Sequence, residues 1–253
     1  MKTCIWCRQT EKETSFLTKA HTFPQSLGGN NICENVCDRC NSFFGNRQSD
    51  APSSEIVLKE LLNISKFYLL NQTNSVPKNQ RFKSEYFNIN WDEYRIRMKP
   101  RYSIKKGFQL KLGRQFRKGV FKVFLEERER QRQDALNNRY NFIREFARYD
   151  MGDYPVYIQI PKLKAIFFSQ LDILEPQIRF TEFSDVQDEE FRIFSYQVCG
   201  HTFVIPTSIL FKDLLLEKFK KSLFHSNDPF GTQLKEIVYA EDLDYTFRYM
   251  NDP

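Results

Sequence analysis

The sequence CDRCN at residues 37–41 repeats a cysteine spacing that occurs once before it, in CIWC at residues 4–7. Two residues between cysteines let both thiolates turn toward one ion, and four thiolates at about 2.3 Å complete a closed tetrahedral zinc site. Zinc binding would supply folding free energy that such a short segment, poor in aliphatic residues, lacks. We therefore predict a structural zinc ion held by Cys4, Cys7, Cys37 and Cys40.

The two remaining cysteines do not form a second pair. Cys33 stands at the wrong spacing from Cys37 for a knuckle, so we expect it to be structural, and Cys199 lies in a strand-like run that predicts a core position. The N-terminus lacks the apolar segment of a signal peptide, and the chain has no apolar run of about 18 residues. We expect a cytoplasmic protein with no membrane contact, in a compartment where disulfides are rare.

One of the three histidines lies between the cysteine pairs, in AHTFPQSLGG at residues 20–29. Histidine titrates near neutral pH and can take a proton from water. The apolar run that begins at His21, the two glycines and the second cysteine pair favour a β-hairpin followed by a helix. His21 would then face the helix across a small cleft. His201 and His225 have no such surroundings, and we interpret them as structural.

Taken in order, these residues resemble the HNH endonucleases with a ββα-metal fold, in the branch supported by a zinc knuckle. The resemblance covers residues 1–50, about a fifth of the chain, and its ordered combination is more specific than any single piece. The matching residues are Cys4, Cys7, His21, Pro24, Gly28, Gly29, Asn35, Cys37, Cys40, Asn41, Phe44 and Gly45.

The resemblance implies a mechanism for phosphodiester hydrolysis. His21 would accept a proton from the attacking water, and a divalent cation, Mg²⁺ or Mn²⁺, would bind a phosphate oxygen and stabilise the leaving 3′ oxygen. Asn35 matches the middle asparagine, which orients the histidine through its amide, with Asn30 or Asn31 as alternatives. Asn41 matches the position that often holds the catalytic metal.

One position departs from the family pattern. The residue before the histidine is commonly Asp or Glu, a metal ligand, and here it is Ala20. A site for a hard cation thereby loses its best oxygen ligand. Asp50 is our first candidate to replace it, and Asp38, inside the second cysteine pair, is a poorer one. Alternatively, the chain is catalytically inactive.

Positive charge gathers between Arg95 and Leu125, where eleven Lys or Arg residues alternate with aromatic residues and no acidic residue occurs. Such a tract can follow a phosphate backbone, with an affinity that falls as salt rises, although a solvated face over an aromatic core gives the same pattern. The sequence that follows, EERERQRQD at residues 126–134, is typical of an exposed helix face with i,i+4 ion pairs. The predicted nucleic-acid contacts are Arg95, Arg97, Lys99, Arg101, Lys105, Lys106, Lys111, Arg114, Arg117 and Lys118.

The composition changes after residue 50, which divides the chain into a zinc-stapled module, residues 1–50, and a mixed domain, residues 51–253. We predict an α+β fold: an N-terminal ββα-metal module with a four-cysteine zinc site, then a domain of helices and an antiparallel sheet. Helical spacing indicates one helix over 53–70 with Ser53 or Ser54 as its N-cap, one or two over 114–149 with a weak point at Gly119, and one over 208–224 capped by Ser208. Strands are predicted within 82–91, 94–104, 154–160, 163–171, 177–183, 191–199 and 201–206.

The leading functional hypothesis is a metal-dependent endonuclease that cleaves DNA, with RNA as the alternative substrate. Small stand-alone proteins of this family often act in bacterial or phage defence, which the resemblance extends to this chain as an expectation. Two alternatives remain open. One is a non-catalytic zinc protein that binds nucleic acid, motivated by Ala20, and the other is a subunit that a protein partner activates within a multi-component system.

Overall fold

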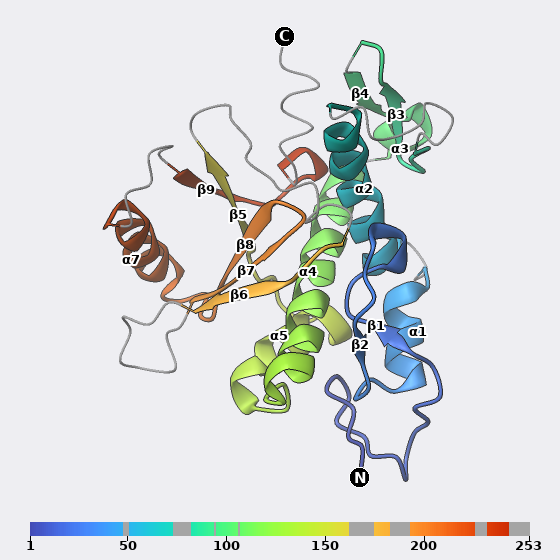
Figure 1. Ribbon diagram of the computed structural model, residues 1–253, viewed down its shortest axis with the longest axis vertical. Helices are drawn as coiled ribbons and strands as arrows, with labels where there is room; N and C mark the ends of the chain where they lie inside the picture. Colours follow the sequence, from blue (N-terminus) through green and yellow to red (C-terminus); the bar gives the residue numbers. More distant parts are fainter. Residues whose placement is uncertain are drawn as a thin grey trace.

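The computed structural model describes residues 1–47, 51–72, 82–93, 95–105, 107–161, 175–182, 193–225 and 232–242. The strand predicted within 163–171 and the candidate residues Asp50 and Lys106 lie outside these ranges. Helix α4 (Phe108–Arg132) runs through the middle of the molecule, with the N-terminal segment and helix α2 (Ser54–Gln72) on one side and a sheet on the other (Figure 1). Within the described residues, no helix combines the length and apolarity that crossing a bilayer requires.

The N-terminal segment contains two short strands followed by a helix, in the predicted order. Strand β1 (Ala20–His21) pairs antiparallel with β2 (Ile32–Cys33), and helix α1 (Asp38–Gly45) begins inside the second cysteine pair. The connection between the strands requires glycine at position 29, because a Cβ there would lie 2.2 Å from the carbonyl oxygen of Phe23.

Helices α2 and α4 pack closely against each other. The Ser53 hydroxyl accepts a hydrogen bond from the backbone N–H of Ile56 at 3.1 Å, which confirms the predicted cap of α2. A Cβ at Gly119 would lie 3.0 Å from both the Ser54 carbonyl oxygen and Leu58 Cβ. Gly119 therefore marks the close approach of the two helices and does not interrupt α4. A separate helix, α5 (Asn141–Tyr149), completes the predicted helical region.

A β-hairpin leads from α2 toward α4. Strands β3 (Phe87–Asn90) and β4 (Arg95–Met98) pair antiparallel. The strand predicted within 94–104 stops before Pro100, where the short helix α3 (Pro100–Ser103) begins. Proline favours the first position of a helix because its missing N–H would have no partner there in any case.

The sheet has the order β6-β7-β8-β5-β9, and all its pairings are antiparallel. Its strands are β5 (Tyr157–Pro161), β6 (Arg179–Glu182), β7 (Ile193–Val198), β8 (His201–Pro206) and β9 (Thr232–Glu236). The edge strand β9 was not predicted, because its sequence TQLKE lacks apolar alternation. The observed architecture is thus a mixed α and β fold with antiparallel sheets, as predicted.

Helices cover both faces of this sheet. On one face, α7 (Lys212–His225) packs through Leu215, Leu216 and Phe219. This helix begins at Lys212, four residues after the predicted cap at Ser208. On the other face, aromatic rings of α4 and the sheet meet, with ring centroids 5.7 Å apart for Phe116–Phe203 and 4.9 Å for Phe124–Phe194.

One hydrophobic core extends from the zinc-knuckle residues to the sheet. It includes the buried side chains of Cys4, Phe44, Phe124 and Ala240. The N-terminal segment therefore shares its core with the rest of the described chain, and the division at residue 50 stays a prediction.

Candidate zinc site and histidine cavity

The four predicted zinc ligands lie together. Their sulfur atoms are all within 4.8 Å of one another, and the sulfurs of Cys7 and Cys37 are 3.7 Å apart. Ligands at about 2.3 Å from a tetrahedral zinc ion have sulfur–sulfur separations of about 3.8 Å. The four cysteines thus fit a zinc ion. Cys33 is not in this cluster and is buried on β2, and Cys199 is also buried, as predicted.

The pKa values of the cysteine thiols in the cluster shift in opposite directions. A hydrogen bond from Cys40 lowers the pKa of Cys4 to about 5, while burial raises the pKa of Cys7 to about 11. Helix α5 brings a cation to the cluster, because the Arg148 guanidinium donates to the sulfur of Cys40 at 3.3 Å. A zinc ion with four thiolates carries a net negative charge, which this arginine offsets.

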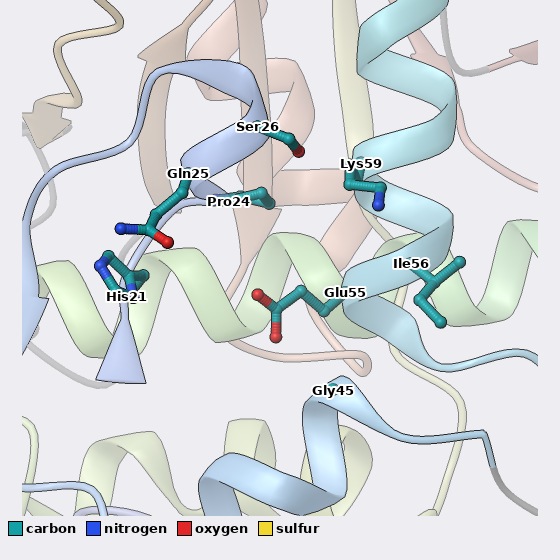
Figure 2. Close-up of a pocket in the computed structure, with 8 residues that line it drawn as sticks. All are labelled: His21, Pro24, Gln25, Ser26, Gly45, Glu55, Ile56 and Lys59. Atoms are coloured by element: carbon teal, nitrogen blue, oxygen red, sulfur yellow. The ribbon is translucent and has the colours of Figure 1, made fainter. Parts of the chain in front are cut away.

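His21 lines an open cavity of about 300 Å³ (Figure 2). Its ring is partly buried and, in the described part of the chain, has no hydrogen-bond partner. Figure 2 shows the Glu55 carboxylate of α2 pointing across the cavity toward the His21 side, with Lys59 one turn further along the same helix. The cavity is lined by His21, Pro24, Gln25, Ser26, Gly45, Glu55, Ile56 and Lys59.

A buried ion pair on α4 holds the strand that carries His21. The Lys122 ammonium donates to the His21 carbonyl oxygen at 2.7 Å and to the Glu126 carboxylate at 2.9 Å. The other oxygen of Glu126 accepts from the indole N–H of Trp6, inside the first knuckle, at 3.1 Å. Burial raises the pKa of Glu126 to about 7, and the Lys122 ammonium and Trp6 oppose that rise. This pair therefore joins the zinc knuckle to the histidine strand.

The asparagines of the hairpin also bind α4. The Asn35 amide donates to Glu129 at 2.5 Å, so the structure directs it to α4 where we expected a contact with His21. The Asn31 amide donates to Glu127 at 3.3 Å, and the Thr22 hydroxyl hydrogen-bonds to the same carboxylate. Asn30 is exposed.

These contacts overturn the expectation of an exposed helix face for residues 126–129, whereas residues 130–133 are exposed as predicted. Glu126 and Glu127 have no exposed surface, and Glu129 is only 8% exposed. Their carboxylates lie inside because donors from the N-terminal segment satisfy them. Those donors come from positions about a hundred residues earlier, so no local pattern could have indicated them.

Two of the other predicted site residues lie near the strand but do not line the cavity. The amide nitrogen of Asn41 on α1 donates to the Thr18 hydroxyl at 3.1 Å, which leaves its amide oxygen available as an acceptor or ligand. Asp38 accepts from the backbone N–H groups of Leu17 and Thr18 at 2.9 and 2.7 Å. Hydrogen bonds from the hydroxyls of Ser15 and Thr18 lower the pKa of Asp38 to about 2, so this carboxylate secures the loop before β1.

The predicted nucleic-acid contacts separate into two groups. Arg114, Arg117 and Lys118 form ion pairs with Asp150 and Asp153, and the Lys118 side chain is only 2% exposed. They join α4 to the end of α5 and do not form an open basic surface, which corrects the expectation for these three. Lys99 is partly buried and donates to a backbone carbonyl. The exposed members are Arg95, Arg97, Arg101, Lys105 and Lys111.

The β3–β4 hairpin and α3, which together carry three of the five exposed cations, are attached beside the cavity. Glu60, the neighbour of cavity residue Lys59, accepts from the Ser84 hydroxyl at 2.6 Å and from the backbone N–H of Glu85 at 2.8 Å. Arg47, just beyond α1, also pairs with Glu85. The base of the basic hairpin therefore adjoins the helices that form the cavity walls.

Comparison with known proteins agrees with this geometry. Residues 4–56 match the family model described as HNH endonuclease. The N-terminal region is an HNH module. The matched segment extends past residue 50 into α2 and includes Glu55. No curated protein and no solved structure matches the chain. The HNH match and the four clustered cysteines indicate nuclease activity and a zinc site.

Proposed function

We propose that this protein is a metal-dependent endonuclease that hydrolyses phosphodiester bonds in DNA, with β1, β2 and α1 as its ββα-metal unit. The observation that carries the proposal is the placement of His21 within the HNH module. Its ring opens on a cavity that also holds a carboxylate and an ammonium group. Those are the charges that proton transfer and phosphate binding require.

In this mechanism, a ring nitrogen of His21 takes a proton from water. The water oxygen forms a bond to phosphorus as the bond from phosphorus to the 3′ oxygen breaks. Lys122 keeps the ring directed at the cavity because it holds the His21 carbonyl oxygen from the opposite side. The Lys59 ammonium, on the cavity wall, attracts the phosphate.

The cavity residues fit a hard divalent cation. Its walls offer carboxylate, amide and hydroxyl oxygens and no thiol, a donor set that suits Mg²⁺ or Mn²⁺ more than zinc. Asn41, which the resemblance places at the metal, does not line this cavity and is therefore not among the proposed ligands. When bound, the cation stabilises negative charge on the phosphate and on the leaving 3′ oxygen.

A nicking assay tests the proposal. Zinc-loaded protein with Mg²⁺ or Mn²⁺ should nick supercoiled plasmid DNA, and His21→Ala should abolish nicking while zinc content and melting temperature stay unchanged. His225→Ala, on α7, is the matched histidine control and should nick like the wild type. Equal nicking by His21→Ala would refute the proposal. A folded wild type that binds DNA without cleaving it would favour the non-catalytic or partner-activated alternatives.

The exposed cations of β4 and α3 are the proposed DNA surface. Arg97→Gln and Arg101→Gln should each weaken plasmid binding and lower the dependence of affinity on salt by about one counterion. Lys118→Gln serves as the contrast, because its charge is already paired with Asp150 and should not alter the salt slope. Fluorescence anisotropy with a labelled DNA fragment, over a series of salt concentrations, measures the affinity and its dependence on salt. A single-stranded RNA of the same length as that fragment tests the alternative substrate.

A further inference from the structure

We infer that Glu55 supplies the carboxylate ligand for the catalytic cation, in place of the acid that is missing at position 20. This inference rests on the proposed function and names the residue that completes its metal site. Three observations carry it: the orientation of Ala20, the absence of a direct hydrogen bond or ion pair to Glu55 within the described residues, and the space that Gly45 leaves beside it.

Position 20 faces the wrong side of the strand for a cavity ligand. Ala20 has no exposed surface and is part of the hydrophobic core, opposite Cys33 in the register of β1 and β2. Successive residues of a strand point to opposite faces, so His21 faces the cavity while residue 20 faces the interior. An oxygen ligand for a cation beside His21 therefore has to come from another element of the fold.

Among the described residues that line the cavity, Glu55 is the acidic one. It stands in the first turn of α2, and Figure 2 shows its carboxylate directed into the space between His21 and Gly45. In the ranges that the structure describes, no hydrogen bond or ion pair engages this carboxylate, although its charge interacts with that of the buried Lys122 ammonium. The buried acids Glu60, Glu126 and Glu129, in contrast, are each held by donors.

A first-turn acid often serves only to stabilise the positive end of the helix. That role explains an acidic residue at position 55, and the Lys122 ammonium on the His21 carbonyl oxygen attracts its charge, but neither supplies a hydrogen bond to the carboxylate. The N-terminus of α2 also has its own cap, because Ser53 accepts the N–H of Ile56. Within the described residues, the Glu55 carboxylate thus faces the cavity without a direct donor, and this is the feature that indicates a ligand.

Space for a hydrated cation is kept open by the end of α1. A Cβ on Gly45 would lie 3.8 Å from a carboxylate oxygen of Glu55, so a longer side chain there would enter the cavity beside that oxygen. A cavity of about 300 Å³ accommodates a cation that keeps several of its waters, as Mg²⁺ prefers, together with a phosphate group. Lys59, one turn along α2, then lies where it attracts the phosphate.

Binding of Mn²⁺, measured without DNA, tests the inference independently of activity. Zinc-loaded full-length protein is titrated with Mn²⁺, and free Mn²⁺ is measured by electron paramagnetic resonance. The wild type should bind one Mn²⁺, and Glu55→Gln should bind it at least about tenfold more weakly, because even residues that only support a ligand contribute about 10- to 100-fold to metal affinity. Glu217→Gln, an exposed acid on α7, is the matched control and should bind Mn²⁺ like the wild type.

A second variant changes Gly45, another residue that lines the same cavity. Gly45→Leu keeps the carboxylate but fills the space beside it, and it should also weaken Mn²⁺ binding. Zinc content and melting temperature show whether each variant is folded. If Glu55→Gln fails to fold, Gly45→Leu decides the question.

The outcomes separate this inference from the proposed function. Unchanged Mn²⁺ affinity in folded Glu55→Gln, or no Mn²⁺ binding by the wild type, would overturn the assignment of Glu55. Nicking that still depends on His21 in that case would leave the nuclease proposal standing. Mn²⁺ binding that depends on Glu55, in a protein whose nicking does not depend on His21, would confirm the site and refute the proposed mechanism.

Discussion

The two sides of helix α4 hold their neighbours by different means. Toward the HNH module, the helix presents Lys122, Glu126 and Glu129, which bind backbone and side-chain groups of the knuckle and the hairpin. Toward the sheet it presents Phe116 and Phe124, which pack against aromatic rings. Residues three or four apart share a helix face, so one helix keeps the two kinds of contact apart.

The two kinds of contact have different consequences. One fixes the position of single atoms, and the other contributes mainly to the stability of the fold. Aromatic packing is strong but tolerates small shifts, whereas a hydrogen bond to a particular carbonyl oxygen constrains one atom. The His21 carbonyl oxygen is held in this second way. We conclude that the sheet side mainly stabilises α4, and that α4 in turn positions the histidine.

The largest expected effect comes from removing zinc. Zinc binding to four-cysteine sites contributes about 10–16 kcal/mol, comparable to the whole stability of a domain, so chelation or Cys40→Ala should unfold the HNH module and abolish nicking. Hydrogen exchange should then show lost protection at residues 4–45 before strands β7 and β8 lose theirs. Cys33→Ala is the matched control, because Cys33 lies outside the metal cluster, and it should retain zinc. If residues 4–45 and strands β7 and β8 lost protection at the same time, the two sides of α4 would not differ in this way.

A comparison of Lys122→Met with Phe124→Ala tests directly whether one side of α4 positions His21 while the other side stabilises the helix. Breaking a buried ion pair and truncating a core phenylalanine each cost about 3–5 kcal/mol, so urea denaturation should give similar losses. Nicking by the folded fraction should differ, because only Lys122→Met releases the His21 carbonyl oxygen. Phe124→Ala should nick at nearly the wild-type rate at a temperature where it is folded.

The double variant Lys122→Met/Glu126→Leu sharpens this test. Replacing both partners by apolar residues should recover much of the stability, because no unpaired charge stays buried. Nicking should remain low, since the bond to the His21 carbonyl oxygen is still missing. Recovery of nicking together with stability would show that the pair acts only through the overall fold.

The smallest expected effect concerns a polar contact between α2 and the sheet. His201 on β8 is buried, and its Nε2 lies 3.0 Å from the Ser65 hydroxyl of α2. Burial lowers its pKa from 6.5 to about 4. The unfolded chain therefore takes up a proton at higher pH than the folded protein, and stability should fall as the pH drops from 6.5 to 4. The expected loss is about 3 kcal/mol by pH 4.

His201→Gln isolates this contribution. Glutamine can still bond to Ser65 but does not titrate in this range, so its stability should depend less on pH between 6.5 and 4. Urea denaturation at several pH values measures the slope. Identical slopes for wild type and variant would assign the acid sensitivity to other groups.

The sequence predicted the parts of the site that depend on local spacing. The cysteine knuckles, the hairpin with His21 and the cap at Ser53 are encoded within a few residues of one another, and the structure contains them. The basic tract was predicted less well, because its composition could not separate exposed cations from those that Asp150 and Asp153 neutralise. Strand β9 escaped prediction because it has no apolar alternation of its own.

By itself, the sequence determined that this protein has a four-cysteine site and a histidine between its halves, because ligand spacing and turn glycines act over short stretches of chain. Only the tertiary structure decided which groups surround that histidine. Glu55 approaches the histidine from α2, and Lys122 and Glu126 approach its strand from α4, far along the chain from His21. Their roles depend on how α2 and α4 pack, and close packing between distant segments leaves no local pattern in the sequence.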